Sequence, residues 1–545
     1  MFLIHPDYHA ARKAIEKLHA TLTALNPTPI VAIPVKSHWL FWFGCKPSDN
    51  LHSFNNGSIV GKLTFHECCC PRVSASDTDL PEALHPLLQA VKVGIGPTGI
   101  TLAPWGITNV YYDGSSASDM QLLLADANGH VPSPCGFAVL ATVGYLPGNV
   151  TLFERIRKIP FLHAYDVTQG KLISLRSFVP REPDDAAMMD RCTAIVPQYS
   201  NQVLGISGGY DSRFVVAVLM SAGIRPTLLH LDGAESPIVS QLGAALGLET
   251  RLLAHGSRLP DGLRAILTDG QLHLSEGNYH TLWGALSRDS IYHSGLFAEA
   301  LVKNAFKTAW KVPGPRRYLL DRLIRRGLLN TAPQEVNGLS ACTSRAEIAA
   351  FLKDELAFLK EPCSCWSRKA AANWFHYVNQ GLRWCQAYTG ALAYFAYPVF
   401  LLSDLDALAV GIGSSFWCNF RKDRVRRLNY KLMPEVEVPY FDGRPARPDG
   451  WLREQLLKIP YEYGTRLGQW LEAHRRFKRA GRTSGESTDA REYGCGLPEM
   501  RRYITADTSV LLADRGCSIN VKRATKTLYH VMNYLLRGRV EWTVP

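Results

Sequence analysis

The stretch that decides the fold runs from residue 203 to residue 219 and reads Val203-Leu204-Gly205-Ile206, Ser207-Gly208-Gly209-Tyr210-Asp211-Ser212, Arg213 and Phe214-Val215-Val216-Ala217-Val218-Leu219. A short apolar run, a glycine turn and a second apolar run predict a buried parallel strand, a loop and a helix. The alternation continues with predicted strands at 227–231 and 250–253 and a predicted helix at 238–246. We therefore expect an α/β fold with a doubly wound parallel sheet.

The glycine turn contains residue types suited to binding phosphate. Gly208 and Gly209 let main-chain N–H groups approach an anion closely, and the start of the following helix adds partial positive charge. Ser207 and Ser212 offer hydroxyl donors, and Asp211 is placed to hold a magnesium ion. A plain serine and glycine turn is the alternative, and the flanking strand and helix favour the phosphate-binding interpretation.

Outside this region the residue pattern changes along the chain, from short β-prone runs to helical periodicity. Short β-prone runs, among them 30–33, 110–112 and 137–140, predict a β-rich domain over residues 1–180. A polar break at 181–185 separates it from a second domain, residues 181–545, in which helical periodicity dominates from 315 onward. The segment 474–491 is rich in Arg, Gly, Ser and Thr and predicts a mobile loop.

Composition narrows the classes of protein and partner. With 60 Lys and Arg against 48 Asp and Glu, the net charge of +12 favours an anionic ligand or partner. The 13 cysteines include no C-x-x-C pair, which predicts free thiols in a cytoplasmic, reducing setting and no sulfur-bound metal. The first residues lack the pattern of a secretory signal, and the apolar run 387–402 is too short for a membrane span, so we expect no membrane partner.

The hexapeptide SGGYDS after VLGI resembles the pyrophosphate loop of the asparagine synthetase family, within the ATP pyrophosphatase fold. The similarity extends to 143–160, 230–237, 244–248 and 397–404, and covers most of residues 105–445. It implies an N-terminal glutaminase-like, Ntn-type β-sandwich and a C-terminal synthetase domain.

The resemblance also implies a reaction and its cofactors, ATP and Mg²⁺. The substrate carboxylate attacks ATP to form an adenylate, pyrophosphate departs, and an amine then attacks the adenylate. The implied ATP and pyrophosphate ligands are Ser207, Gly208, Gly209, Tyr210, Asp211, Ser212, Leu231, Asp232 and Gly233.

Three features depart from the family pattern. Position 2 is Phe2, where glutamine-using members have a cysteine nucleophile, so the N-terminal domain is expected to be a scaffold. The family's second acidic loop falls at 292–299, where only Glu299 is acidic; it is either a catalytic and metal ligand beside Asp211 or a surface glutamate. The family's catalytic lysine corresponds to Lys422 or Lys431, and either is alternatively a solvated helix lysine.

These features favour a ligase that uses an amine already present in its substrate. The first interpretation is an intramolecular cyclase similar to lasso peptide cyclases, acting on a precursor peptide beside a partner protease. The alternatives are an ammonia-using, asparagine synthetase-like amidotransferase, a tRNA-modifying enzyme and a degenerate nucleotide-binding protein. The absence of paired cysteines counts against the tRNA enzyme, so a nucleic-acid partner is not expected.

Overall fold

The computed structural model of the protein describes about three fifths of the chain. The residues described are 1–23, 30–35, 37–42, 51–53, 59–61, 93–95, 100–102, 109–161, 163–174, 178–181, 184–194, 196, 201–254, 260–271, 284–287, 290–296, 315–329, 339–381, 386–387, 390–392, 395–401, 405–413, 423–441, 443–447, 498–504 and 519–537. The predicted loop at 474–491 lies outside them.

The strands between residues 2 and 174 form antiparallel sheets. The six-stranded sheet has, in spatial order, β10 (Arg157–Lys158), β8 (Tyr111–Tyr112), β9 (Ala117–Ser118), β1 (Phe2–His5), β3 (His38–Trp42) and β2 (Val31–Val35). The four-stranded sheet has β12 (Lys171–Ser174), β11 (His163–Asp166), β7 (Ile100–Leu102) and β6 (Val93–Ile95), and β4 (Leu51–Ser53) pairs with β5 (Ile59–Gly61). The strand predictions at 30–33 and 110–112 are confirmed by β2 and β8.

Residues 137–140 are helical, which corrects the prediction of a strand there. They lie in α4 (Pro134–Val143), where Pro134 occupies the first turn and the Ser133 hydroxyl accepts the Gly136 N–H at 3.2 Å. Gly144 ends the helix in the left-handed conformation, with φ 90°. All four residues are buried, so no polar position marks a helical period, and a short apolar run then has the same pattern in a strand and in a helix.

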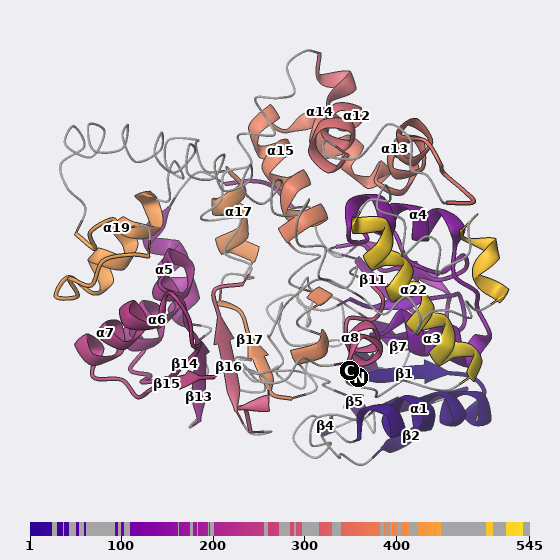
Figure 1. The fold of residues 1–545 in the computed structure, drawn as a ribbon, viewed down its shortest axis with the longest axis horizontal. Helices are drawn as coiled ribbons and strands as arrows, with labels where there is room; N and C mark the ends of the chain where they lie inside the picture. The colour runs from indigo at the N-terminus through magenta and orange to yellow at the C-terminus, as the bar shows by residue number, and fades with distance from the viewer. Residues whose placement is uncertain are drawn as a thin grey trace, which may run out of the picture.

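The centre of the second half is a five-stranded parallel sheet. Its spatial order is β15 (Thr250–Leu253), β14 (Thr227–Leu231), β13 (Gln202–Gly205), β16 (Ile291–Ser294) and β17 (Tyr397–Val399). Figure 1 shows these strands beside α5 (Asp185–Ala194), α6 (Tyr210–Ser221), α7 (Ser236–Leu246), α17 (Leu405–Gly413) and α19 (Asp423–Leu432). The predicted strands at 227–231 and 250–253, and the predicted helix at 238–246, are confirmed. The chain is thus of mixed α/β class.

Both faces of the parallel sheet are buried, as parallel strands require. Alternate residues enter two different apolar clusters. One cluster joins the sheet to α5, α6, α7, α17 and α19 and includes Leu204, Leu228 and Ile291. The opposite face, with Val203, Leu229 and Tyr292, belongs to a larger cluster that reaches back to the N-terminal strands.

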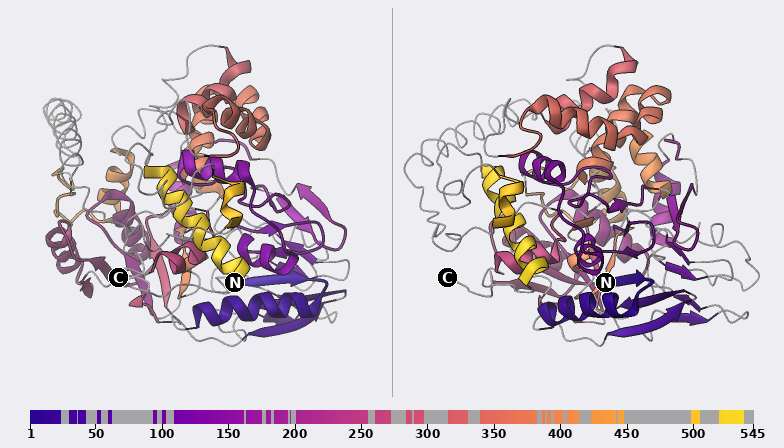
Figure 2. Two further views of the ribbon diagram at one scale, coloured as in Figure 1. Left: turned by 45° about the vertical axis from the view of Figure 1, so that its right-hand side comes forward. Right: turned by 90° about the vertical axis from the view of Figure 1, so that its right-hand side faces the viewer.

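That larger cluster unites elements distant in sequence. Its helices include α1 (Tyr8–Leu22), α3 (Gln121–Asn128), α8 (Asp261–Leu267), α12 (Leu319–Leu323), α13 (Arg345–Glu355), α14 (Lys360–Cys365), α15 (Arg368–His376) and α22 (Ile519–Arg537). The shorter 3₁₀ and π turns are η2 (Arg316–Tyr318), η3 (Ile324–Leu328), η4 (Ala357–Leu359), η5 (Tyr377–Gly381) and η8 (Pro498–Arg502). Helix α22, yellow in Figures 1 and 2, packs against α4 and α8, so the C-terminal helix stabilises the N-terminal half.

Burial of His530 in α22 predicts a loss of stability in mild acid. Desolvation lowers the pKa of His530 to about 4 from its ordinary 6.5. The unfolded chain therefore binds this proton near pH 6.5, whereas the folded chain binds it only near pH 4. The free energy of unfolding is therefore highest above pH 6.5, and it falls by about 3 kcal/mol as the pH decreases to 4. Replacing His530 with glutamine should flatten this part of a plot of thermal midpoint against pH.

The exposed His9 on α1 provides the matched control for this measurement. The variant His9→Gln should keep the slope of the parent chain between pH 6.5 and 4. Equal slopes for the parent chain and His530→Gln would contradict the expected neutral, buried imidazole.

No helix in the described part of the chain is long and apolar enough to cross a membrane. Within the apolar run 387–402, residues such as Ala391, Phe400 and Leu401 are buried in the protein core, as predicted. The proposed boundary after residue 180 falls between β12 and α5.

Candidate functional site

The loop 206–209 lies where the strand order of the parallel sheet reverses. From β13, the chain adds β14 and β15 on one side, and β16 and β17 follow on the other. In open α/β sheets, ligands bind outside the carboxyl ends of the strands at such a reversal. The loop after β13 and the loop after β16 both begin at this edge, because the two strands are parallel neighbours.

The loops that follow β13 and β16 are in direct contact. A Cβ atom added to Gly295 would lie 2.8 Å from the Ser212 nitrogen and 2.9 Å from the Asp211 Cβ atom. Real Cβ atoms do not approach other atoms this closely, so the position requires glycine. The first turn of α6 is therefore seated against the end of β16.

Within the loop, side-chain oxygens accept two of the backbone N–H groups. The Ser207 N–H donates to the Ser212 hydroxyl oxygen at 3.0 Å, and the Gly209 N–H donates to the Ser207 hydroxyl oxygen at 3.2 Å. The two hydroxyl oxygens are 3.1 Å apart. The loop is thus a compact turn that places both hydroxyl groups beside the glycine backbone.

A carboxylate outside the loop accepts the remaining N–H group of the glycine turn, that of Gly208. The Gly208 N–H donates to Glu235 Oε2 at 2.6 Å, and Glu235 immediately precedes α7. The Gly208 N–H, which the sequence assigns to phosphate, therefore already donates to an anionic oxygen. A phosphate oxygen that binds the Gly208 N–H has to displace this carboxylate. The sequence indicated no role for Glu235, because this residue matches no position of the loop motif.

We therefore expect Glu235→Gln to bind inorganic pyrophosphate about tenfold more tightly than the parent chain in the absence of Mg²⁺. Glutamine keeps the acceptor oxygen and the side-chain length, and the like-charge repulsion is removed, which is worth on the order of 1 kcal/mol at contact distance even in bulk water. Isothermal titration with pyrophosphate measures the change. Glu249→Gln, at an exposed glutamate paired with Arg251, should leave the affinity unchanged. Weaker binding of pyrophosphate by Glu235→Gln would mean that the Glu235 carboxylate contributes to anion binding and does not oppose it.

The predicted ATP ligands Leu231, Asp232 and Gly233 lie in a capped turn at the end of β14. The Asp232 carboxylate accepts the Ser236 hydroxyl at 2.7 Å, and the Ser236 oxygen accepts the Gly233 N–H at 2.8 Å. The Asp232 N–H donates to the Leu253 carbonyl at 2.8 Å, while the Leu231 side chain is half-buried. Asp232 and Gly233 are exposed at the surface, and the same turn delivers Glu235 to Gly208.

A stack of aromatic and guanidinium groups holds the start of α6 against residues 438–441 and Arg444. The rings of Tyr210 and Tyr440 are 4.0 Å apart at an angle of 15°. The Arg213 guanidinium lies 4.2 Å from the Tyr440 ring centre, and that of Arg444 lies 4.9 Å from the Tyr210 ring centre. The Asn429 amide donates to the Tyr210 carbonyl and to the Tyr440 hydroxyl, each at 3.1 Å.

The same segment contacts the glycine turn itself. The Phe441 N–H donates to the Gly208 carbonyl at 3.0 Å, and the Phe441 side chain is 50% exposed. An exposed aromatic ring beside the glycine turn offers an apolar surface to a ligand bound there. The sequence contained no signal for this contact, because the two partners are more than 200 residues apart.

The predicted catalytic residues are placed as follows. Lys431 is exposed on α19, two residues after Asn429 and thus about 200° around the helix from the side chain that contacts the loop. Lys422 and Glu299 lie outside the described residues.

Two carboxylates at the loop fit a magnesium ion by their chemistry. Asp211 is in the first turn of α6 and Glu235 contacts Gly208, and carboxylate oxygens are the ligands that Mg²⁺ prefers. Asp232 is a poorer candidate, because Ser236 already donates to its carboxylate.

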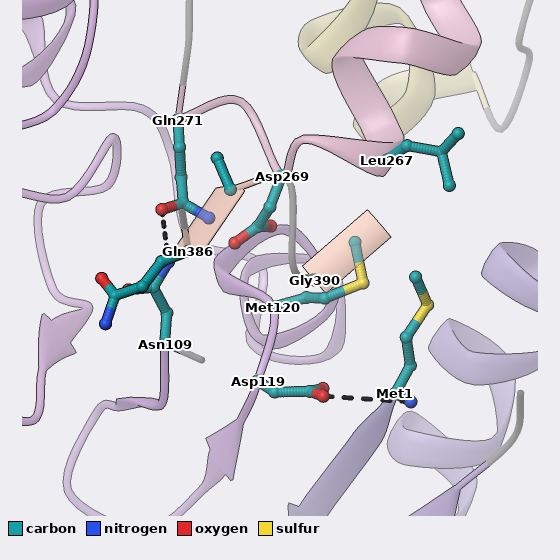
Figure 3. Close-up of a pocket in the computed structure, with 10 residues that line it drawn as sticks. Met1, Asn109, Asp119, Met120, Leu267, Asp269, Gln271, Gln386 and Gly390 are labelled. Atoms are coloured by element: carbon teal, nitrogen blue, oxygen red, sulfur yellow. Dashed lines mark hydrogen bonds and ion pairs between the residues drawn. The ribbon is translucent and has the colours of Figure 1, made fainter. Parts of the chain in front are cut away.

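A second polar region, shown in Figure 3, lies between the N-terminal strands and residues 267–271, 386–387 and Gly390. Its cavity is about 20 Å³, which holds a single water molecule but no nucleotide. The Met1 ammonium group is 3.9 Å from the Asp119 carboxylate, and the Asp269 carboxylate accepts the N–H groups of Gln121 and Leu122, each at 2.9 Å. Burial raises the pKa of Asp269 well above its ordinary value. These groups stabilise the start of α3.

Comparison with known proteins assigns no family to the chain. No protein-family model matches it, and no curated protein matches it significantly. The function is therefore inferred from the residues and contacts of the loop 206–212 and its neighbours.

Proposed function

We propose that the chain is an ATP-dependent carbon–nitrogen ligase of the asparagine synthetase type. The observation that supports it best is the SGGYDS turn between β13 and α6, seated against Gly295 where the strand order reverses. The finer architecture we propose is a glutaminase-like N-terminal scaffold followed by an ATP pyrophosphatase domain.

The proposed reaction forms an amide bond in two steps. An oxygen of the substrate carboxylate attacks the α-phosphorus of ATP, the bond from that phosphorus to the bridging oxygen breaks, and pyrophosphate leaves. An amine then attacks the acyl carbon, AMP leaves, and the amine proton passes to solvent. Positioning and charge neutralisation are the expected sources of rate enhancement.

The loop residues have separate roles in this proposal. The N–H groups of Gly208 and Gly209 and the hydroxyl groups of Ser207 and Ser212 hold the departing pyrophosphate. Asp211 and Glu235 hold Mg²⁺, which when bound neutralises phosphate charge. The capped turn after β14 holds the adenosine.

The source of the amine is proposed from the environment of Phe2. Its side chain is 1% exposed and packs in an apolar cluster with Ile4, Leu40 and Val110. An apolar ring in this core cannot release ammonia from glutamine as a nucleophile would. Between free ammonia and an amine of the substrate, we propose the substrate amine, as in an intramolecular peptide cyclase. The net charge of +12 suits an acidic peptide or partner.

One observation favours a second candidate, a nucleotide-binding protein without turnover. The Glu235 carboxylate already contacts the Gly208 N–H, and so competes with phosphate for it. Such a protein would bind ATP and leave it intact.

The proposal is tested with purified full-length chain, ATP, Mg²⁺ and peptides that carry a free N-terminal amine and an internal Asp or Glu. We expect AMP and pyrophosphate to form and pyrophosphate to exchange into ATP, and Asp211→Asn to lose both activities. ATP binding without AMP formation across the peptide panel would select the second candidate. Formation of ADP and phosphate would exclude the proposed ligase chemistry.

A further inference from the structure

Two thiols from distant parts of the sequence meet at the junction of α4 and α13. Cys135 is the second residue of α4, and Cys342 lies three residues before α13. Their sulfur atoms are 3.2 Å apart although the residues are separated by 207 positions, and α13 packs against α4. A disulfide bond is about 2.05 Å long, so the two sulfurs need to approach by only about 1 Å.

The backbone holds the two cysteines in this arrangement. Cys342 has a φ of 49°, a left-handed conformation that few residues other than glycine adopt. Close by, the Ser340 N–H donates to the Tyr503 carbonyl at 3.0 Å, and the Tyr503 hydroxyl donates to the Pro132 carbonyl at 3.1 Å. The segment before Cys342 is therefore tied, through Tyr503, to the segment before Cys135.

The two thiols are also accessible and chemically distinct. Both side chains are half-buried, so neither is sealed in the core. Burial, together with the neighbouring Cys135, raises the pKa of the Cys342 thiol to about 12, and this thiol donates to the Cys135 sulfur. Because the Cys342 thiol donates its hydrogen bond to the Cys135 sulfur, Cys135 is the sulfur placed to react first, as the thiolate is the nucleophile in disulfide exchange.

We propose that Cys135 and Cys342 form a reversible dithiol–disulfide site that takes a small disulfide such as glutathione disulfide as its oxidant. Cys135 loses its proton to solvent and attacks one sulfur of the oxidant, which releases one glutathione thiolate. Cys342 then loses its proton to solvent and attacks the Cys135 sulfur, which releases the second. Two protein thiols are oxidised, and one small disulfide is reduced to two thiols.

A disulfide between Cys135 and Cys342 would close a loop of chain that contains most residues of the proposed site. The loop between Cys135 and Cys342 contains β13, β14, β15 and β16 and the turn 207–212. Closing so long a loop restricts the unfolded chain, and for this size of protein it raises the thermal midpoint by roughly 5 °C. The inference does not depend on nucleotide binding.

The test equilibrates the full-length chain in buffers of defined glutathione ratio, blocks free thiols by alkylation and maps disulfide-linked peptides by mass spectrometry. We expect a Cys135–Cys342 peptide that forms in oxidising buffer and disappears on reduction, together with the rise in thermal midpoint. Cys135→Ser and Cys342→Ser should each abolish the linked peptide and the rise.

Cys365→Ser is the matched control, because Cys365 is an exposed thiol whose sulfur lies beside the Ser364 hydroxyl, and it should behave like the parent chain. Peptide mapping of the parent chain decides the question even where a serine variant fails to fold. Alkylation of both Cys135 and Cys342 at every glutathione ratio, or a link from either one to a different cysteine, overturns the proposal.

Discussion

Replacing Gly295 with alanine is expected to lower the rate of AMP formation by about 100-fold. The added Cβ atom would lie 2.8 Å from the Ser212 nitrogen and 3.0 Å from the Asp211 carbonyl carbon, both of them backbone atoms. The first turn of α6 or the loop after β16 must therefore shift. A displacement approaching 1 Å at a site that works by positioning costs about 100-fold in rate. The rate of AMP release under saturating ATP measures the effect.

Gly284→Ala is the matched control, because an added Cβ at Gly284 meets no atom within 4 Å. It should retain the rate of the parent chain. If Gly295→Ala kept a normal rate while remaining folded, the contact between the two loops would have no part in the reaction.

Removing the Arg213 side chain is expected to destabilise the folded chain by about 3 kcal/mol. Arg213 is 2% exposed, donates to the Val438 carbonyl at 2.6 Å and also donates to the Pro439 carbonyl. Alanine would leave both carbonyls without this donor, would remove the stack on Tyr440, and would open a cavity. We expect a fall in thermal midpoint of about 3 °C for a chain of this length.

Arg251→Ala provides the contrast, since Arg251 is an exposed arginine in a surface ion pair with Glu249. Such pairs contribute little, so its thermal midpoint should match the parent chain. Equal thermal midpoints for Arg213→Ala and Arg251→Ala would show that the contacts of the buried Arg213 guanidinium with residues 438–440 do not stabilise the folded chain. Weaker ATP binding by Arg213→Ala would extend the role of this segment to the nucleotide site.

Three of the five strands of the parallel sheet were predictable because their signals are local, whereas β16 and β17 were not predicted as strands. The strands β13, β14 and β15 and the helices α6 and α7 each have an apolar run bounded by a glycine or polar turn. The helix α4 was not predictable in the same way. Its apolar residues are buried on all sides, and the capping by Ser133 and Gly144 was the local evidence for a helix.

The candidate site was predictable only in its central loop. Residues 207–212 lie together in the sequence, so their chemistry is visible there. Glu235, residues 438–441 and Arg444 reach the loop through the tertiary fold, and no spacing in the sequence relates Phe441 to Gly208. The contact between Cys135 and Cys342 was not predictable for the same reason, because it depends on how α13 packs against α4.

Equilibrium titration with ATP in the presence of Mg²⁺ tests most directly whether the 207–212 turn binds the phosphates of ATP. The parent chain is expected to bind with a Kd between about 1 μM and 1 mM, the range usual for enzyme substrates. Asp211→Asn should bind at least tenfold more weakly, while Asp190→Asn, at an exposed carboxylate on α5, should bind like the parent. Absence of saturable ATP binding by the parent chain, or equal affinity in Asp211→Asn, would contradict the account.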